Sequence, residues 1–439
     1  MHADLLVKNG TVISHRGIEI TSIAIKDGKI VALGDLGHVD ADNVIDAKGL
    51  HVLPGVIDTQ VHFREPGLEY KENLATGTAA AAMGGVTAIF EMPNTNPLTL
   101  TAADMADKVR RGREKAWTDF AFFIGAAAEN VSELAMLEKQ EGVSGVKLFM
   151  GSSTGSLLVD NDADIRRVLK AGYRRVAIHA EDEPRLLERR HLAKDTVLNH
   201  PVWRDEVVAY RATERVLKIA RETGRRIHVL HITTKEEMGL LAQYKDIATV
   251  EVTPQHLTLS APDCYEELGS FAQMNPPIRD EAHRLGLWQG LRDGVVDVIG
   301  SDHAPHTREE KANAYPASPS GMPGVQTLLP LLLDHYNKRA LSLAHVMDLT
   351  SAGPARIYGI AGKGRIALGY DGDLTLVDLN RKEEITEDWL AAKCGWSPFT
   401  GKRVQGWPVG TIIRGRSVMR DGELIGPPAG QPVRFQECL

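Results

Sequence analysis

The chain has 439 residues, of which 43% are hydrophobic and 25% are charged, a composition that suits a protein with a large buried core. Its formal charge of −7 argues against a surface for nucleic acid or for an anionic membrane. No segment approaches the ~20 apolar residues of a membrane span, and the first residues lack the basic and apolar regions of a signal peptide. Cys264, Cys394 and Cys438 show no paired spacing, which fits a reducing compartment. We therefore expect a cytoplasmic protein that binds neither nucleic acid nor membrane.

The two ends of the chain alternate apolar and polar residues in short runs, as half-buried strands do. Asp27-Gly28 near the N-terminus and Asp421-Gly422 near the C-terminus separate such runs. An Asp-Gly pair favours the type I′ turn of a hairpin, because both central residues need a positive φ. Strand-rich ends around a different middle predict a small β-sandwich domain assembled from residues 1–53 and 365–439.

The middle of the chain, residues 54–364, alternates strand and helix signals. Amphipathic stretches at residues 100–116, 203–224 and 236–245 predict helices. Eight strand candidates lie at residues 53–64, 85–94, 119–130, 143–150, 174–182, 226–233, 248–254 and 294–306. Alternating units favour a parallel sheet with helices outside it, and eight of them favour a closed (β/α)8 barrel of the TIM type. An open doubly wound sheet is the alternative, but no glycine-rich fingerprint opens the first unit.

Residues of the types that bind metal ions follow five of these strands. They are His62, Lys147, His179, His231 and Asp302. Because the carboxyl ends of the strands in such a barrel converge on one mouth, we expect these side chains to share a site. Imidazole, carboxylate and a modified lysine suit Zn²⁺, and an open position on the ion would activate water. The pattern predicts a metal-dependent hydrolase that acts on a small-molecule substrate.

Two of these residues could react or transfer protons in addition to binding a metal ion. Lys147 lies between apolar residues, where burial lowers the pKa of a lysine, and the neutral amine can then capture carbon dioxide as a carbamate that bridges two metal ions. Asp302 could hold a metal ion with one oxygen and accept a proton from the attacking water with the other. Taken one at a time, a lysine at a strand end is more often a surface residue and a lone histidine more often a structural one. Their occurrence together favours ligands.

Other polar residues stand where they could hold a substrate. Arg64 lies two residues after His62, so on an extended segment both side chains point the same way, and a guanidinium can bind an anionic group with two hydrogen bonds. Asn94, Asn275 and His306 follow strand-like segments or lie in loops stiffened by proline, and could contact an amide-containing ligand. Individually, the asparagines are more often turn formers, and an arginine beside a loop histidine is more often a surface residue.

These residues lie within motifs that resemble those of the cyclic amidohydrolases, and most closely those of the class I dihydroorotases, over nearly the whole chain. The motifs are VHFREPG (61–67), EMPNTNP (91–97), GVKLFMG (145–151), IHAED (178–182), HVLHITTKE (228–236), EVTPQHL (251–257), MNPPIR (274–279), GSDHAPHT (300–307) and GRIALGYDGDLTLVD (364–378). The resemblance implies a zinc-dependent enzyme of pyrimidine biosynthesis that interconverts L-dihydroorotate and N-carbamoyl-L-aspartate, in a homodimer or a higher homo-oligomer.

Carried over residue by residue, the resemblance implies a set of zinc ligands, a general base and a set of substrate contacts. The zinc ligands are His62, Lys147 as its carbamate, His179 and His231, with Asp302 as the metal-bound general base; the substrate contacts are Arg64, Asn94, Asn275, His306 and the backbone around Gly321, under a flap at residues 151–160.

Three positions depart from the family pattern. Gln60 stands where the family has its first zinc histidine, Gln255 where it often has a histidine, and Gln326 where it often has a glutamate. A neutral amide oxygen is a poor Zn²⁺ ligand beside imidazole, so we expect one firmly bound zinc ion, at His179 and His231, and an uncertain second one. Two alternatives stay open: another cyclic amidase of the hydantoinase or allantoinase type, and a catalytically silent homologue that binds aspartate transcarbamoylase.

Overall fold

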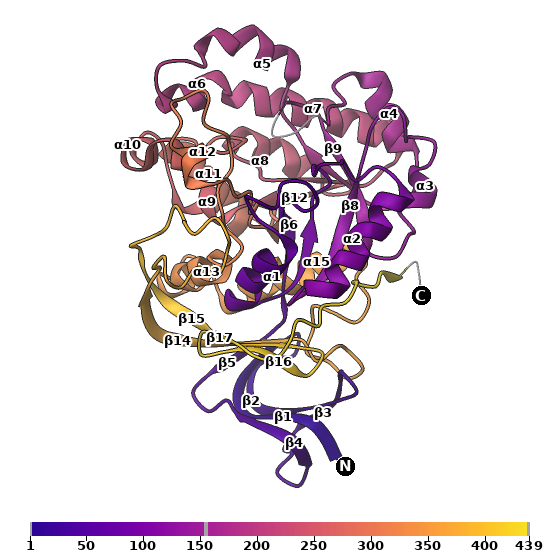
Figure 1. Ribbon diagram of the computed structural model, residues 1–439, viewed down its shortest axis with the longest axis vertical. Coiled ribbons are helices and arrows are strands. Elements are labelled where there is room, and N and C mark those ends of the chain that lie inside the picture. Colours follow the sequence, from indigo (N-terminus) through magenta and orange to yellow (C-terminus); the bar gives the residue numbers. More distant parts are fainter. Residues whose placement is uncertain (1, 153–156, 437–439) are drawn as a thin grey trace.

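The computed structural model describes residues 2–152 and 157–436 of the chain (Figure 1). In the view of Figure 1, a parallel sheet surrounded by helices occupies the upper part. A second sheet, built from indigo strands of the N-terminal end and yellow strands of the C-terminal end, lies below it. Residues 153–156 of the expected flap, and Cys438, lie outside the described residues.

The upper sheet is a barrel whose strands follow one another in chain order. Its strands are β6 (Val56–Val61), β7 (Val86–Glu91), β8 (Asp119–Gly125), β9 (Val143–Phe149), β10 (Val176–His179), β11 (Ile227–Val229), β12 (Ala248–Val252) and β13 (Val298–Ile299). Neighbouring strands pair in parallel. The first and last strands meet through a parallel bridge between Val61 and His303 and a 2.7 Å hydrogen bond from the His62 amide to the His303 carbonyl. The prediction of eight strands in a (β/α)8 barrel is confirmed.

Helices connect the strands and surround the barrel (Figure 1). The α-helices are α1 (Leu74–Met83), α2 (Ala102–Lys115), α3 (Leu134–Leu137), α4 (Asp162–Lys170), α5 (Glu183–Arg189), α6 (His200–Trp203), α7 (Glu206–Thr223), α8 (Lys235–Leu241), α9 (Pro254–Thr258), α10 (Asp263–Leu268), α11 (Glu281–Arg292), α12 (Arg308–Lys311), α13 (Leu328–Asn337), α14 (Leu343–Met347) and α15 (Gly353–Tyr358). Short 3₁₀ turns lie at Arg190–Leu192, Val197–Asn199, Ala242–Tyr244 and Gly269–Ala272, and a π-helical turn at Asp348–Ala352.

The three helices expected from amphipathic stretches are α2, α7 and α8. Their N-caps are Thr101, Asp205 and Thr234, and each of these side chains accepts a hydrogen bond from the backbone N–H three residues later. Such a cap satisfies one of the free donors at a helix start and stabilises the helix by about 1 kcal/mol. Helix α7 ends at Gly224, whose φ of 70° suits glycine in a left-handed cap.

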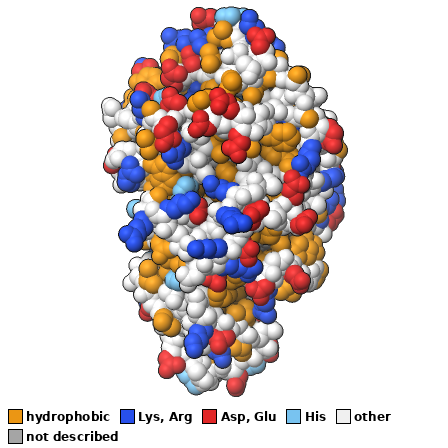
Figure 2. Space-filling view, turned by 90° about the vertical axis from the view of Figure 1, so that its left-hand side faces the viewer, with side chains coloured by type: hydrophobic (Ala, Val, Ile, Leu, Met, Phe, Trp, Pro, Cys, Tyr) orange, Lys and Arg blue, Asp and Glu red, His pale blue; other side chains and the backbone are white. Residues whose placement is uncertain are grey.

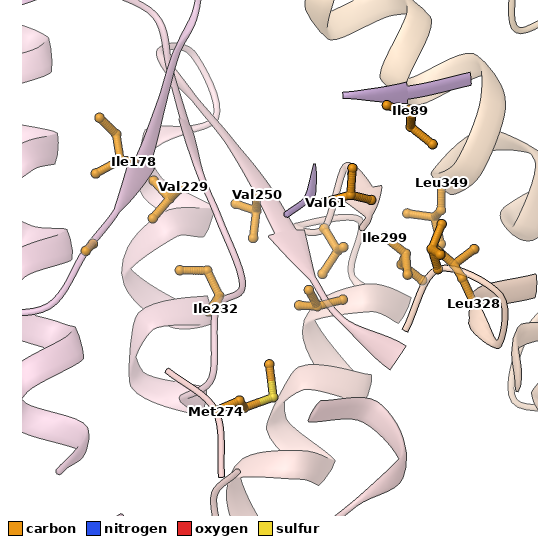
Figure 3. Packing of buried hydrophobic residues seen from close by; sticks show 14 of the residues in the cluster. Val61, Ile89, Ile178, Val229, Ile232, Val250, Met274, Ile299, Leu328 and Leu349 are labelled. Carbon is orange, nitrogen blue, oxygen red and sulfur yellow. The ribbon is translucent and has the colours of Figure 1, made fainter. Parts of the chain in front are cut away.

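One continuous apolar core joins the strands of the barrel to the helices around it (Figure 3). Ile178, Val229 and Val250 come from the neighbouring strands β10, β11 and β12 and are fully buried. Each such side chain contributes about 1.5–3 kcal/mol of burial free energy. Because the strands are buried on both faces, the ends of the strands are where polar side chains can gather.

The second sheet combines strands from both ends of the chain. From one edge to the other it contains β17 (Glu423–Leu424), β16 (Arg416–Arg420), β15 (Arg403–Ile413), β14 (Leu374–Glu384), β5 (His51–Pro54), β1 (His2–Ser14), β2 (Gly17–Lys26) and β3 (Lys29–Gly34), with β4 (Asp40–Asp46) also paired to β1. Asp27-Gly28 and Asp421-Gly422 both have positive φ angles and connect hairpin strands, as predicted. Residues of β1 and β2 belong to two separate apolar clusters, so both faces of these strands are covered. The exact division into residues 1–53, 54–364 and 365–439 stays a prediction.

A buried cluster of charged side chains joins the barrel to this second sheet. The Lys363 ammonium lies 2.7 Å from Asp119, at the start of β8, and 3.1 Å from Asp371. It also pairs with Asp373, the residue before β14, and Arg414 of the terminal sheet pairs with Asp119. Lys363 is only 4% exposed, so water cannot replace it as the partner of these carboxylates.

The outer surface carries charges of both signs. On the face shown in Figure 2, acidic and basic side chains are interspersed, with several Lys and Arg side chains across its middle. Within residues 2–152 and 157–436, no helix has both the length and the apolar character needed to cross a membrane. Cys264 and Cys394 are buried free thiols.

Candidate active site

The residues that follow the barrel strands line one pocket at the mouth of the barrel. Its walls are Gln60, His62, Lys147, Phe149, His179, His231, Asn275, Asp302, Ala304, Ser320 and Gly321. All five predicted metal-binding residues, and two of the predicted substrate contacts, therefore meet in one place. The other three, Arg64, Asn94 and His306, lie directly behind the wall, in contact with its residues or their neighbours. The cavity volume is about 20 Å³, enough for a water molecule but not for a ring, so a cyclic substrate requires the walls to move apart.

His62, directly after β6, and Asp302, after β13, face each other across the pocket. His62 Nε2 and Asp302 Oδ1 are 3.2 Å apart. His62 Nδ1 lies 2.9 Å from Asn94 Oδ1, so the ring donates its N–H there. Burial lowers the pKa of His62, and the neutral ring then presents the lone pair of Nε2 to the Asp302 carboxylate. Two acceptor atoms that face each other in this way favour a cation between them.

Gln60 contacts the same carboxylate oxygen. Its Nε2 donates a 3.0 Å hydrogen bond to Asp302 Oδ1, while its Oε1 is buried and has no hydrogen-bond partner in the described part of the chain. The backbone amides of Gln60 and Ser301 both donate to Asp58 Oδ1, at 3.2 and 3.0 Å, which ties β6 to the segment before Asp302. The Gln60 side chain therefore offers Asp302 its NH₂ group rather than its oxygen.

His179, at the end of β10, and His231, after β11, form a second pair. His179 Nε2 lies 2.9 Å from Glu181 Oε2 and donates to it, which leaves Nδ1 as an acceptor 3.0 Å from His231 Nε2. Arg204 donates to both oxygens of Glu181, at 3.0 and 2.7 Å. Burial raises the pKa of Glu181, but Arg204 and His179 outweigh this effect and hold the pKa well below its usual range. A carboxylate that orients an imidazole in this way is typical of histidines that bind metal ions.

Lys147 comes from β9 and lies in the same pocket as both pairs. Its side chain is 1% exposed, and burial lowers its pKa to about 7. The Nζ atom lies 4.4 Å from the centre of the Phe149 ring. A substantial fraction of this lysine is therefore an uncharged amine at neutral pH, which is the form that reacts with carbon dioxide.

The spacing of the donors fits metal ions, provided that Lys147 takes part. Two ligand atoms at roughly 2.0–2.2 Å from a tetrahedral zinc ion are about 3.3 Å apart. The His62–Asp302 contact of 3.2 Å and the His179–His231 contact of 3.0 Å are close to that separation. Among the described residues, no three His, Cys, Asp or Glu side chains form a metal-binding group by themselves. A carboxylated Lys147 would add the missing donor to each pair.

Arg64 and His306 form a basic end of the site together with Lys71. Arg64 Nε donates to the Pro305 carbonyl at 3.2 Å, and its Nη2 lies 3.3 Å from His306 Nε2. His306 Nε2 is 3.0 Å from the Ser320 carbonyl, and its Nδ1 is 3.0 Å from Lys71 Nζ. Burial lowers the pKa of Arg64 to about 10, so the guanidinium stays charged at neutral pH. In the described chain these contacts of Arg64 are with a carbonyl and an imidazole, not with a carboxylate.

Three of the site residues have an unusual backbone conformation. Arg64, His231 and Asp302 have φ angles of 65°, 38° and 45°. The left-handed region costs a residue other than glycine about 1–3 kcal/mol and persists where the surrounding structure enforces it, most often at functional sites. The turns after β6, β11 and β13 thus direct these side chains at the expense of backbone strain.

Several residues that shape the site were not singled out from the sequence. Glu181 follows His179 by two positions, as Arg64 follows His62, so the same rule of alternation could have found it. Glu251, fully buried in β12, accepts a 3.0 Å hydrogen bond from the Thr59 hydroxyl. Burial raises its pKa to about 8, so this carboxyl is mostly protonated and uncharged at neutral pH. The sequence did not indicate Glu251, because a single acidic residue within an apolar strand forms no repeating pattern.

The chain is similar to known proteins of one family. The chain matches the profile of the Amidohydrolase family over residues 51–418. It belongs to that family. The dihydroorotase of Methanosarcina mazei is 37% identical, over 97% of this chain and 96% of its own length. The allantoinase of Escherichia coli is 36% identical, over 98% of both chains. The solved structure of L-hydantoinase (dihydropyrimidinase) from Arthrobacter aurescens has a TM-score of 0.93 at 28% identity and covers 98% of this chain and 99% of that one.

These relatives confirm the resemblance that the motifs indicated. The chain is a cyclic amidohydrolase, an enzyme of a family that generally depends on metal ions. The relatives differ in the ring that their names specify, so family membership does not by itself select the substrate.

Proposed function

We propose that this enzyme is a zinc-dependent dihydroorotase, which catalyses the reversible hydrolysis of L-dihydroorotate to N-carbamoyl-L-aspartate in pyrimidine biosynthesis. The observation that carries the proposal is Arg64, a buried cation at the basic end of the site. L-dihydroorotate bears a carboxylate on its ring, whereas hydantoins and allantoin are uncharged at the matching position. Similarity to dihydroorotases over nearly the full length of the chain supports the same choice.

Arg64 lacks a directly bonded carboxylate in the described chain. It is 3% exposed, and Asp302, Glu91 and Glu310 are near enough to attract its charge, but none of these described carboxylates hydrogen-bonds to it. A buried charge without a directly bonded opposite partner is unfavourable. The Nε–H of Arg64 donates to the Pro305 carbonyl, and its other N–H groups remain as donors for a carboxylate. A substrate carboxylate would supply both the charge and the acceptors, so recognition of an anion relieves an unfavourable feature of the free enzyme.

The metal centre belongs to this proposal. Carbon dioxide would add to the neutral Lys147 amine, forming a C–N bond with loss of one proton, and the carbamate oxygens would join His62 and Asp302 on one side and His179 and His231 on the other. Zinc bound there would supply a Lewis acid that polarises the ring carbonyl and makes water a better nucleophile. Because Gln60 offers Asp302 an N–H donor, we propose that the ion at His179 and His231 is held more firmly.

The side chains of this protein then have distinct roles. Asp302 accepts the proton of the attacking water and passes it to the ring nitrogen that leaves, which is general base and then general acid catalysis by one carboxylate. Arg64 and His306 bind the carboxylate of the substrate. Asn275 and the backbone at Gly321, both in the wall of the pocket, would hydrogen-bond the ring. Asn94 accepts a hydrogen bond from His62 Nδ1, and we propose that it also contacts the substrate ring.

One rival has a specific observation in its favour. An allantoinase and a hydantoinase also match this chain over almost its whole length, so a cyclic amidase of another specificity is the second candidate. A silent homologue that binds aspartate transcarbamoylase is a third outcome that the same experiment tests. A homodimer or a higher homo-oligomer stays a prediction, which sedimentation of the purified protein would check.

The deciding experiment is a substrate panel. Purified protein supplied with zinc and bicarbonate is mixed with L-dihydroorotate, hydantoin, dihydrouracil or allantoin, and ring opening is followed by absorbance. We expect turnover of L-dihydroorotate and at least a hundredfold lower kcat/KM for the uncharged rings, since ~1.5–3 kcal/mol per charged hydrogen bond from Arg64 and His306 is lost without the carboxylate. Preference for an uncharged ring would establish the rival, and no turnover of any ring would overturn the proposed function and leave the silent homologue.

A further inference from the structure

Lys71 lies at the basic end of the site but has no assigned role. It comes from the loop between β6 and α1, whereas His306 and Glu310 follow β13. The Lys71 ammonium is 3.0 Å from His306 Nδ1 and 2.9 Å from Glu310 Oε1. Its side chain is 12% exposed. We propose that Lys71 is a positioning residue that fixes His306 in the neutral tautomer with its proton on Nε2, the nitrogen that faces the substrate pocket.

The contacts of His306 distinguish two arrangements of its proton. With the proton on Nε2, the ring donates to the Ser320 carbonyl at 3.0 Å and accepts from Lys71 at 3.0 Å. With the proton on Nδ1, the ring would accept from Arg64 at 3.3 Å, and its donor would face Glu310 at 3.6 Å, beyond a hydrogen bond. The second arrangement would also bring the Nδ1 proton against the Lys71 ammonium. In the first arrangement the Arg64 Nη2 donor faces the Nε2 donor at 3.3 Å, which is unfavourable. The two shorter contacts, both 3.0 Å, outweigh this longer one and select the tautomer with the proton on Nε2.

The charges around the ring favour its neutral form. Burial is the main cause that lowers the pKa of His306, to about 3; Arg64, Lys71 and Lys311 add to this effect, and Glu310 opposes it. Lys71 Nζ is 3.0 Å from His306 Nδ1, closer than the Glu310 carboxylate at 3.6 Å, and Nζ itself pairs with that carboxylate at 2.9 Å. Lys71 is therefore the hydrogen-bond partner of Nδ1. An ammonium can only donate, so Nδ1 has to accept.

The consequence for binding follows from the position of Ser320 and Gly321 in the wall of the pocket. The Nε2–H group of His306 donates to the carbonyl of Ser320, a residue in the wall of the pocket. A substrate carboxylate would have to take this donor over from the Ser320 carbonyl, and it can do so only when the proton is on Nε2. In the other tautomer Nε2 would present a lone pair and repel the carboxylate. This inference rests on the proposed function only for the identity of the anion; the tautomer itself is a property of the free protein.

The direct test is the protonation pattern of His306 in the absence of substrate. The protein is labelled with ¹⁵N-histidine, and two-bond correlation spectra report which ring nitrogen carries the proton; His306→Gln identifies the signal by its loss. We expect a single tautomer with the proton on Nε2 in the unmodified protein and in Lys71→Arg, which keeps a donor. Lys71→Met should give a mixture of tautomers. Lys245→Met, which removes another half-buried lysine paired with an aspartate, should leave the His306 signal unchanged.

The kinetic test separates positioning from other roles. Lys71→Met should raise the KM for L-dihydroorotate about tenfold or more, the effect of one lost hydrogen bond to a charged group, and change kcat much less. Glu310→Gln keeps the helix cap at Thr307 and leaves Lys71 able to donate. In this variant His306 should therefore keep its proton on Nε2.

Three results would overturn the proposal. A raised KM with an unchanged tautomer would mean that Lys71 binds the substrate directly. A lowered melting temperature of Lys71→Met with the tautomer retained would mean that Lys71 is only structural. If Lys71→Met does not fold, a proton on Nδ1 in the unmodified protein or in Lys71→Arg would be decisive. If no dihydroorotate is turned over but the tautomer shifts in Lys71→Met, the proposed function fails and the positioning role stands.

Discussion

Replacing Gln60 with histidine should raise the zinc content of this enzyme from about one firmly held ion per chain toward two. In the unmodified protein, the ligands of the ion beside β6 would be His62, Asp302 and the Lys147 carbamate. The Gln60 amide does not add a ligand, because it donates its N–H to Asp302 at 3.0 Å. The Gln60 oxygen has no hydrogen-bond partner among the described residues, yet an amide oxygen competes poorly with imidazole for zinc. The substitution adds a nitrogen donor where the family pattern has one.

The size of the effect follows from the count of good donors. Loss of one ligand or of the group that orients it weakens a zinc site about 10–100-fold, or roughly 1.4–2.7 kcal/mol. Dissociation constants for the second ion in the two proteins should therefore differ by that factor, whereas the ion at His179 and His231 should be held equally by both. Turnover should rise together with occupancy of the weaker site.

The assay is zinc content by mass spectrometry after dialysis against zinc buffers of graded free concentration. Gln255→His is the matched control, because Gln255 is also fully buried but its amide donates to the Ser301 carbonyl. That variant should keep the zinc content of the unmodified protein. Two zinc ions of equal affinity in the unmodified protein would refute the reasoning, and would mean that Gln60 turns its oxygen to the metal.

Three more substitutions test other parts of the molecule. Lys147→Ala should lose tightly bound zinc and activity, and short carboxylic acids should restore part of both by replacing the carbamate; full activity without such acids would exclude the lysine as a ligand. Arg64→Met should raise the KM for L-dihydroorotate about 10–150-fold, from ~1.5–3 kcal/mol per charged hydrogen bond, at unchanged zinc content; the opposite result would assign Arg64 to the metal centre. Lys363→Met should lower the free energy of unfolding by about 3–5 kcal/mol in urea titrations, because it leaves buried carboxylates unpaired. Its control, Lys218→Met, removes an exposed ammonium whose partner, Glu214, is also exposed, and should cost below about 1 kcal/mol; equal losses would show that burial of the Lys363 cluster adds no stability.

The strands of the barrel and the residues at their ends could be predicted because one physical rule covers both. A strand buried on two faces is apolar along its length, so a histidine or aspartate at its end or shortly after it is conspicuous. His62, His179 and Asp302 were found in this way, and the structure brings all of them to one pocket. The Asp27-Gly28 turn was equally accessible, since its requirement for positive φ is local.

The residues that escaped prediction act through distant partners. Arg204 lies in the turn before α7, far along the chain from His179, and reaches the site only by its hydrogen bonds to Glu181. Lys71 lies in a loop whose course the sequence does not reveal, and its contact with His306 depends on how two loops pack. No periodicity encodes such contacts, because they join segments whose relative placement follows from the whole fold.

The pairing of β5 with β14 has a consequence for how the protein is made. Strand β5 ends at Pro54, and the antiparallel partner that covers its edge starts at Leu374, after the entire barrel. At ~5–20 residues per second, the ribosome needs roughly 15–65 seconds to reach that partner. During this interval the edge of β5 is an open template for a strand of another nascent chain. A chain that stops before β14 would therefore keep this edge, and aggregation of truncated products is the expected result of premature termination.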